Sequence, residues 1–179
     1  PECGAMDLLV AADDRTGALE TAAALADHGA GPVAVRVWPA TLRDEEQGGV
    51  AVIDLGTRAL SADEARRRAA GLPFDRPSAH KIDSTLRGNW AEELVARHET
   101  TGAPVLLVPA LPELGRTCVG GVVLVHGEPV HEVVPGRAAG RHAESSRPAE
   151  LLAAAGATEV VELEDLDAVT AWLAKPHGI

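Results

Sequence analysis

Lysine and aromatic residues are scarce in this sequence, and both shortages restrict what the protein can do. Lys81 and Lys175 are the only lysines among 179 residues, and the formal net charge is −11. A protein that binds nucleic acid needs a basic face, so this charge argues against a nucleic-acid partner. One Phe, three Trp and no Tyr leave an aliphatic core and argue against an aromatic platform for stacking a carbohydrate ring.

Cysteines and long apolar runs are scarce as well. Cys3 and Cys118 are too few for a disulfide scaffold, and their spacing fits no metal motif. No apolar run approaches the ~20 residues of a membrane-spanning helix, and no signal peptide is recognisable at the N-terminus. These absences favour a cytoplasmic protein. The length, with 46% hydrophobic residues, favours one domain with a sizeable core.

Apolar strand patterns alternate with helical patterns along the chain. This alternation predicts an α/β fold of three layers, with a mostly parallel sheet flanked by helices and a β-hairpin near residues 122–134. The expected strands are residues 7–12, 33–38, 50–55, 78–82, 105–109 and 158–163. The expected helices are residues 16–28, 61–70, 89–100, 148–155 and 165–174.

The segment Lys81–Asn89 carries the densest polar chemistry in the chain. It reads Lys-Ile-Asp-Ser-Thr-Leu-Arg-Gly-Asn, with two cations, one carboxylate, two hydroxyls and one amide between an expected strand and an expected helix. One of the two lysines of an arginine-rich chain lies in it. Such convergent donors and acceptors suit a small, oxygen-rich anionic ligand.

Three other segments follow the same strand-then-polar-loop pattern, at residues 10–18, 53–58 and 108–117. In open α/β sheets, ligands bind at the carboxyl ends of the strands. Arginine grips carboxylates or phosphates with paired hydrogen bonds, and helix N-termini add donors for an anion. The candidate binding residues in these loops are Asp13, Asp14, Thr16, Arg58, Lys81, Asp83, Ser84, Arg87, Gly88, Asn89 and Arg116.

Each of these loops also has an ordinary structural interpretation. The aspartates at 13 and 14 fit the N-cap of the next helix, and Arg58 fits a surface position. Lys81 and Asp83 fit a structural ion pair, and Gly115-Arg116 fits a turn. The sequence contains no Gly-x-x-x-x-Gly-Lys-Ser/Thr phosphate loop and no Gly-x-Gly-x-x-Gly motif. The recurrence of four such loops favours a binding site over four unrelated structural features.

Three of these segments together resemble a known family. Ala12–Ala18, Lys81–Asn89 and Pro109–Gly121 are similar to motifs of the N-terminal substrate-binding domain of four-carbon acid sugar kinases, which include D-threonate, D-erythronate and 2-oxo-tetronate kinases. The resemblance spans roughly Asp7 to Glu132, and Lys81–Asn89 is its most specific part. Arg58 lies where the family tends to have an arginine after the third strand.

The resemblance implies a short polyhydroxy acid, such as a tetronate, as the ligand. Arg87 and Arg116, with Lys81 as a third cation, are expected to hold its carboxylate. Asp13 or Asp14 is expected to bind the acceptor hydroxyl and to act as the base in a complete enzyme.

The remaining candidates have supporting roles in this scheme. Asp83, Ser84 and Asn89 are expected to order the ligand hydroxyls and neighbouring side chains, and Thr16, Arg58 and Gly88 complete the expected substrate-binding set.

The sequence departs from the family pattern in three ways. Arg15 replaces the usual leucine, Pro135–Arg147 lacks an expected Asp-Pro element, and the chain stops at Ile179 where the kinases continue into a nucleotide-binding domain. We therefore expect residues 1–179 to form a single sugar-acid-binding domain that binds no cofactor alone. ATP and Mg²⁺ would serve the complete enzyme, through a separate nucleotide-binding domain or chain. The alternatives are a non-catalytic module that binds a metabolite or a partner, and an unrelated small enzyme such as an isomerase or a hydrolase.

Overall fold

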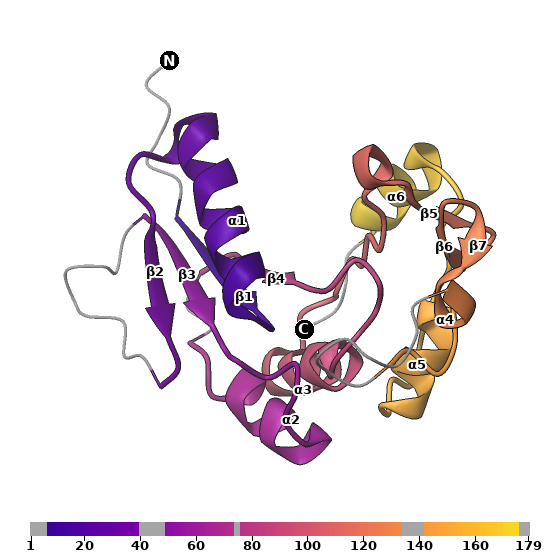
Figure 1. The fold of residues 1–179 in the computed structure, drawn as a ribbon, viewed down its shortest axis with the longest axis horizontal. Coiled ribbons are helices and arrows are strands. Elements are labelled where there is room, and N and C mark those ends of the chain that lie inside the picture. Colours follow the sequence, from indigo (N-terminus) through magenta and orange to yellow (C-terminus); the bar gives the residue numbers. More distant parts are fainter. Residues whose placement is uncertain (1–6, 40–48, 74–75, 134–141, 176–179) are drawn as a thin grey trace.

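A four-stranded parallel sheet forms the first half of the molecule. The computed structural model describes residues 7–39, 49–73, 76–133 and 142–175. The strands are β1 (Leu8–Ala12), β2 (Ala34–Val37), β3 (Val50–Asp54) and β4 (Ser78–Lys81), in the order β2-β3-β1-β4 (Figure 1). All three neighbouring pairs are parallel, so the strands end at one common edge.

Helices cover both faces of this sheet. They are α1 (Arg15–Leu25), which runs into η1 (Ala26–Ala30), α2 (Ala62–Ala70) and α3 (Trp90–Thr101). Side chains alternate along β1, so Val10 packs with Ala18 of α1, whereas Leu9 packs on the opposite face with Ala69 of α2 and Ala96 of α3. The expected three-layer α/β arrangement is confirmed.

A second group of elements follows α3. It comprises η3 (Pro112–Leu114), β5 (Arg116–Val119), β6 (Val122–Val125), β7 (Glu128–Pro129), α4 (Val130–Val133), α5 (Pro148–Ala154) and α6 (Leu166–Leu173). The strands form an antiparallel sheet in the order β5-β6-β7, which includes the expected hairpin. Val123 and Val130 pack against Trp90 and Leu94, so this group rests on α3.

Two of the expected strands are not strands in the part of the chain that the structure describes. Residues 103–110 and 157–164 belong to no described strand, although both carry the apolar residues that predicted one. Conversely, β5 begins at Arg116, inside the segment 108–117 that the sequence suggested as a polar loop. An apolar run identifies a segment that can enter a sheet, but a strand forms only where another strand's edge accepts its hydrogen bonds.

No helix among the described residues is long and apolar enough to cross a bilayer.

Candidate functional site at the carboxyl edge of the parallel sheet

The loops that follow β1, β3 and β4 meet at the carboxyl edge of the sheet. The carbonyl oxygen of Asp13 accepts hydrogen bonds from the backbone N–H groups of Thr57 (2.9 Å) and Arg58 (3.1 Å). The N–H of Asp13 lies 3.4 Å from the carbonyl oxygen of Lys81. Three of the four predicted polar loops are therefore joined through one residue, as the parallel topology requires.

Arg58 is the centre of this site. Its Nε and Nη2 donate to the two carboxylate oxygens of Asp13 at 2.8 and 2.9 Å, and its Nη1 donates to Oδ2 of Asp14 at 2.6 Å. Its Nη2 also lies 3.7 Å from Oδ1 of Asp83. The side chain is 14% exposed, so the surface interpretation of Arg58 is wrong.

Burial has the largest effect on the pKa of Asp13. Its side chain is fully buried, and burial raises the pKa of this carboxyl; the hydrogen bonds and charge of Arg58 oppose that shift, while the nearby charges of Glu93 and Asp14 add to it. Asp14 is more accessible, with its side chain 26% exposed. Its Oδ1 accepts from the N–H of Gly17 at 2.8 Å, so the N-cap interpretation is correct for Asp14.

A second carboxylate–guanidinium pair lies beside the first. Nε and Nη2 of Arg87 donate to the two oxygens of Asp83 at 2.8 and 2.7 Å, and the hydroxyl of Thr85 also donates to Asp83. Burial alone would raise the pKa of Asp83, but the hydrogen bonds from Arg87 and Thr85 and the charge of Arg58 hold it well below its ordinary range. Asp83 is therefore a fixed negative charge.

Gly88 and Asn89 hold the motif loop against the loop that follows β3. Gly88 has φ +90°, and a Cβ there would lie 3.2 Å from Cγ and 3.3 Å from Cα of Arg58. The buried amide of Asn89 donates to the carbonyl oxygens of Thr57 (2.9 Å) and Leu60 (3.0 Å). Gly88 thus allows the two loops to approach closely, and Asn89 holds them together. Both hydrogen bonds from the Asn89 amide go to backbone carbonyls of the protein itself.

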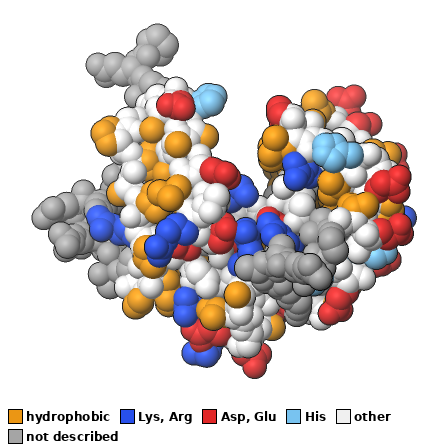
Figure 2. All heavy atoms as spheres, in the orientation of Figure 1, with side chains coloured by type: hydrophobic (Ala, Val, Ile, Leu, Met, Phe, Trp, Pro, Cys, Tyr) orange, Lys and Arg blue, Asp and Glu red, His pale blue; other side chains and the backbone are white. Residues whose placement is uncertain are grey.

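The remaining candidates of these loops, Lys81, Ser84 and Thr16, are half-buried or exposed and make fewer hydrogen bonds. Nζ of Lys81 donates to the carbonyl oxygen of Ile82 at 2.7 Å, and Lys81 forms no ion pair with Asp83 in the described part of the chain. Ser84 is half-buried and Thr16 is exposed; neither hydroxyl is bonded within residues 7–39, 49–73, 76–133 and 142–175. Figure 2 shows the molecule hollowed between its two halves, with Lys, Arg, Asp and Glu side chains at the floor of the hollow.

Arg116 is not brought into this network. It begins β5, in the antiparallel sheet, and its Nη1 donates to the carbonyl oxygen of Leu114 at 2.6 Å. Gly115 before it has φ +69° and ends η3, so the turn interpretation is correct here. Within the described residues, no contact joins Arg116 to the other candidates.

Arg15, Asp54 and Thr57 were not among the candidate binding residues, but they also belong to the site. Asp54, the last residue of β3, accepts hydrogen bonds from Nε of Arg15 (3.2 Å) and the N–H of Gly56 (2.9 Å). The hydroxyl of Thr57 is buried without a partner in the described structure. The position of Asp54 at a strand end was the available signal, but one aspartate at a strand end is too common to single out.

The described residues contain no set of three or more His, Cys, Asp or Glu side chains arranged to hold a metal ion. Asp13 and Asp14 both face Arg58, whose positive charge opposes a cation at the same place. These residues do not fit a magnesium site.

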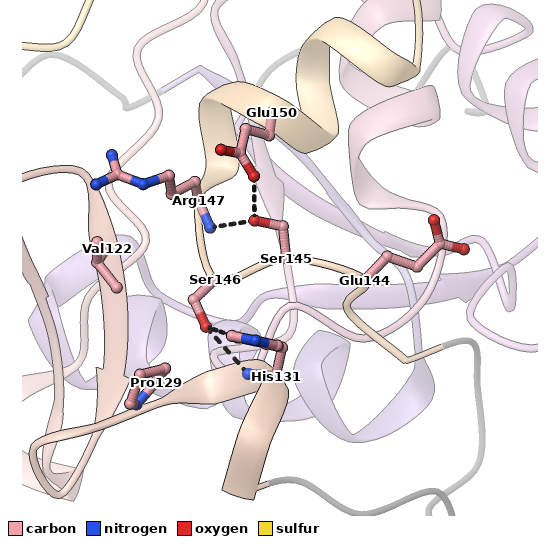
Figure 3. Close-up of a pocket in the computed structure, with 8 residues that line it drawn as sticks. All are labelled: Val122, Pro129, His131, Glu144, Ser145, Ser146, Arg147 and Glu150. Atoms are coloured by element: carbon pink, nitrogen blue, oxygen red, sulfur yellow. Dashed lines mark hydrogen bonds between the residues drawn. The ribbon is translucent and has the colours of Figure 1, made fainter.

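A separate cavity of about 370 Å³ lies in the second half of the molecule (Figure 3). Its two serine hydroxyls are already bonded: Ser145 donates to Glu150 at 2.5 Å, and Ser146 lies 2.7 Å from Nδ1 of His131. None of the candidate residues lines it.

The family model for a sugar-binding N-terminal domain matches residues 8–175. The chain belongs to this sugar-binding family, which confirms the resemblance drawn from its motifs. It is 36% identical to the D-threonate kinase of Cupriavidus necator over 132 residues, which cover 71% of this chain and 32% of that enzyme. It is 32% identical to the D-threonate kinase of Salmonella typhimurium over 190 residues, covering 97% of this chain and 44% of that enzyme.

A D-erythronate kinase from Heliobacterium modesticaldum is 34% identical over 135 residues, covering 70% of this chain and 31% of the enzyme. The chain thus spans less than half the length of the curated relatives it matches. A crystal structure of a domain of unknown function from Bordetella bronchiseptica, described as a domain-swapped dimer with bound citrate, superposes with a TM-score of 0.69 at 26% identity, over 82% of this chain and 39% of that one.

Proposed function

We propose that this chain is the acceptor-binding part of a four-carbon acid sugar kinase, and that it binds a short polyhydroxy acid such as threonate, erythronate or 2-oxo-tetronate. The observation that carries the proposal is the Asp13–Arg58–Asp14 and Asp83–Arg87 network at the carboxyl edge of the parallel sheet. The family match, the relatives that are D-threonate and D-erythronate kinases, and the citrate in the Bordetella structure support it.

The contacts divide the roles among the candidate residues. Asp13 is buried and both its oxygens are bonded to Arg58, so it positions Arg58. Asp14 is the aspartate that a ligand hydroxyl can reach, and it is our candidate for binding that hydroxyl and taking its proton. Lys81 and the outer side of Arg87 remain available for the ligand carboxylate, since Arg87 uses only Nε and Nη2 for Asp83.

Because the described residues do not fit a metal site, a nucleotide-binding domain or chain would have to supply ATP and Mg²⁺. That part would bring the phosphoryl donor to the hydroxyl held by Asp14. The chain alone is then expected to bind the acid without phosphorylating it.

Two substitutions test the site. Asp14→Ala and Arg87→Ala should each weaken tetronate binding by roughly tenfold or more, because each removes a charge-assisted hydrogen bond. Arg147→Ala removes an exposed arginine of the second half and serves as the matched control. Unchanged affinity in both site variants would overturn the assignment.

The non-catalytic alternative makes a different prediction. Adding a separately produced nucleotide-binding part with Mg-ATP should yield a phosphorylated acid if the proposal holds. Saturable binding that never leads to turnover in this reconstituted mixture would favour a metabolite sensor.

A further inference from the structure

Arg15 lies at the β3 end of the row of charged side chains along the carboxyl edge of the parallel sheet. Its Nε donates to Oδ2 of Asp54 at 3.2 Å, and this buried aspartate is the last residue of β3. The side chain of Arg15 is 67% exposed, and its Nη1 and Nη2 donate to no group within residues 7–39, 49–73, 76–133 and 142–175. Arg15 therefore presents a positive charge with free donors beside the site.

The β4 end of the row also has free donors. Arg87 uses Nε and Nη2 for Asp83, which follows β4, so its Nη1 is free among the described residues. Lys81 lies between the two arginines, because its Nζ and Oδ1 of Asp14 both approach the first turn of α1 at Gly17. Cations with free donors thus lie at both ends of the row.

The carboxylates of the row are occupied, in contrast to these donors. Four aspartates accept hydrogen bonds from the protein on both carboxylate oxygens: Asp13, Asp14, Asp54 and Asp83. Asp14 is the most exposed of them and is the one that a ligand hydroxyl can reach. The groups left for a ligand at the two ends are therefore charged donors, which suit negatively charged groups.

The strand order sets the distance between the two ends. β3 and β4 flank β1, so their ends lie two strand spacings apart, which is about 10 Å. A charge-assisted hydrogen bond of about 2.8 Å at each end leaves about 4 Å for the ligand between its charged groups. A chain of four carbons spans about 4 Å, since each carbon–carbon bond is about 1.5 Å long. The row therefore matches a four-carbon acid that is charged at both ends.

We infer that the ligand of this site is a short hydroxy acid with two carboxylates, one bound by Arg87 and Lys81 and the other by the free Nη groups of Arg15. This inference rests on the proposed function and narrows its ligand from an acid with one carboxylate to a diacid. The hydroxyl that Asp14 binds then belongs to an inner carbon, between the two carboxylates. Arg15 determines the specificity, because every other contact of the row serves a monoacid equally well.

Arg67 provides a matched control for Arg15. Its side chain is 74% exposed and pairs with one carboxylate, that of Glu64 on the same helix. Within the described residues it contacts none of the aspartates of the row. An exposed ion pair of this kind has no role in ligand binding, so Arg67→Leu reports what the loss of a surface arginine does by itself.

Calorimetric titration with matched acids tests the inference. D-threonate and D-erythronate carry one carboxylate, and the three tartrate isomers are four-carbon hydroxy acids that carry two. The unsubstituted chain should bind at least one tartrate roughly tenfold or more tightly than either monoacid, because Arg15 adds charge-assisted hydrogen bonds. Arg15→Leu should lose this preference and keep its affinity for the monoacid, Arg15→Lys should keep part of the preference, and Arg67→Leu should keep all of it.

The possible failures point to different errors. A monoacid that binds as tightly as every tartrate, or a preference that survives Arg15→Leu, overturns the inference and leaves the proposed function standing. An equal loss of affinity for monoacids and diacids in Arg15→Leu, with an unchanged circular dichroism spectrum, also overturns it, because Arg15 would then support the site as a whole. No binding of any of the five acids overturns the proposed function and the inference with it.

Discussion

Replacing Arg58 by alanine tests whether the buried ion pair organises the site. The substitution removes the donors to both oxygens of Asp13 and to one oxygen of Asp14. Removing one partner of a buried ion pair costs about 3–5 kcal/mol. Because Arg58 is 14% exposed and water can reach the vacated space, we expect a loss at the lower end of that range, about 3 kcal/mol at pH 7.

The loss should depend on pH in a definite direction. Asp13 already has a raised pKa, and losing Arg58 raises it further above the unfolded value of about 3.9. Between these two pKa values the folded variant binds more protons than the unfolded chain, so its free energy of unfolding falls as the pH rises. The destabilisation should therefore be smaller near pH 5 than at pH 7.

Urea denaturation followed by circular dichroism at both pH values measures the effect. Arg147→Ala is the control and should stay within about 0.5 kcal/mol of the unsubstituted protein. Adding Asp13→Asn to Arg58→Ala should restore part of the stability, since the buried charge is gone. A loss no larger than that of Arg147→Ala would show that the ion pairs of Arg58 do not stabilise the fold.

Two further substitutions probe the motif loop. Gly88→Ala should lower the free energy of unfolding by about 1–3 kcal/mol, because φ is +90° and the new Cβ would contact the backbone of Arg58. Gly102→Ala is the control, since Gly102 also has a positive φ but open space around the new Cβ, and its loss should be smaller. Equal losses for the two variants would contradict the close approach of Gly88 to Arg58. Because the folded pKa of Asp83 is lowered, its stabilisation should be present above about pH 4 and lost as the pH falls through the folded pKa. The stability difference between the unsubstituted protein and Asp83→Asn should thus shrink from pH 5 towards pH 2 in acid titrations followed by urea denaturation, and a constant difference would exclude this charge pair.

The parallel sheet could be predicted from sequence because its signals are local. Strands β1 and β3 are short apolar runs, β1 followed directly by Asp13 and β3 ending in Asp54, and the helices after them begin at capping residues such as Asp14 and Ser61. Parallel strands share a carboxyl edge, so the meeting of the Asp13, Arg58 and Lys81 loops followed from the topology.

Contacts between residues that are far apart in the sequence could not be predicted in the same way. The pattern at Val105–Val108 shows that the segment is apolar but not which edge it faces, and the strand expected there is unpaired. The sequence likewise did not indicate that Arg58 would bond both oxygens of Asp13 or that the amide of Asn89 would be used by backbone carbonyls. Such pairings depend on distances between loops that are far apart in the chain.

We propose that the carboxyl edge of the parallel sheet binds a short hydroxy acid through its charges. Calorimetric titration with D-threonate and D-erythronate, beside the uncharged polyols threitol and erythritol, separates the effect of the acid group from that of the hydroxyls. We expect saturable binding of at least one acid and none of its polyol. Equal binding of acid and polyol, or no binding of any acid, would contradict it.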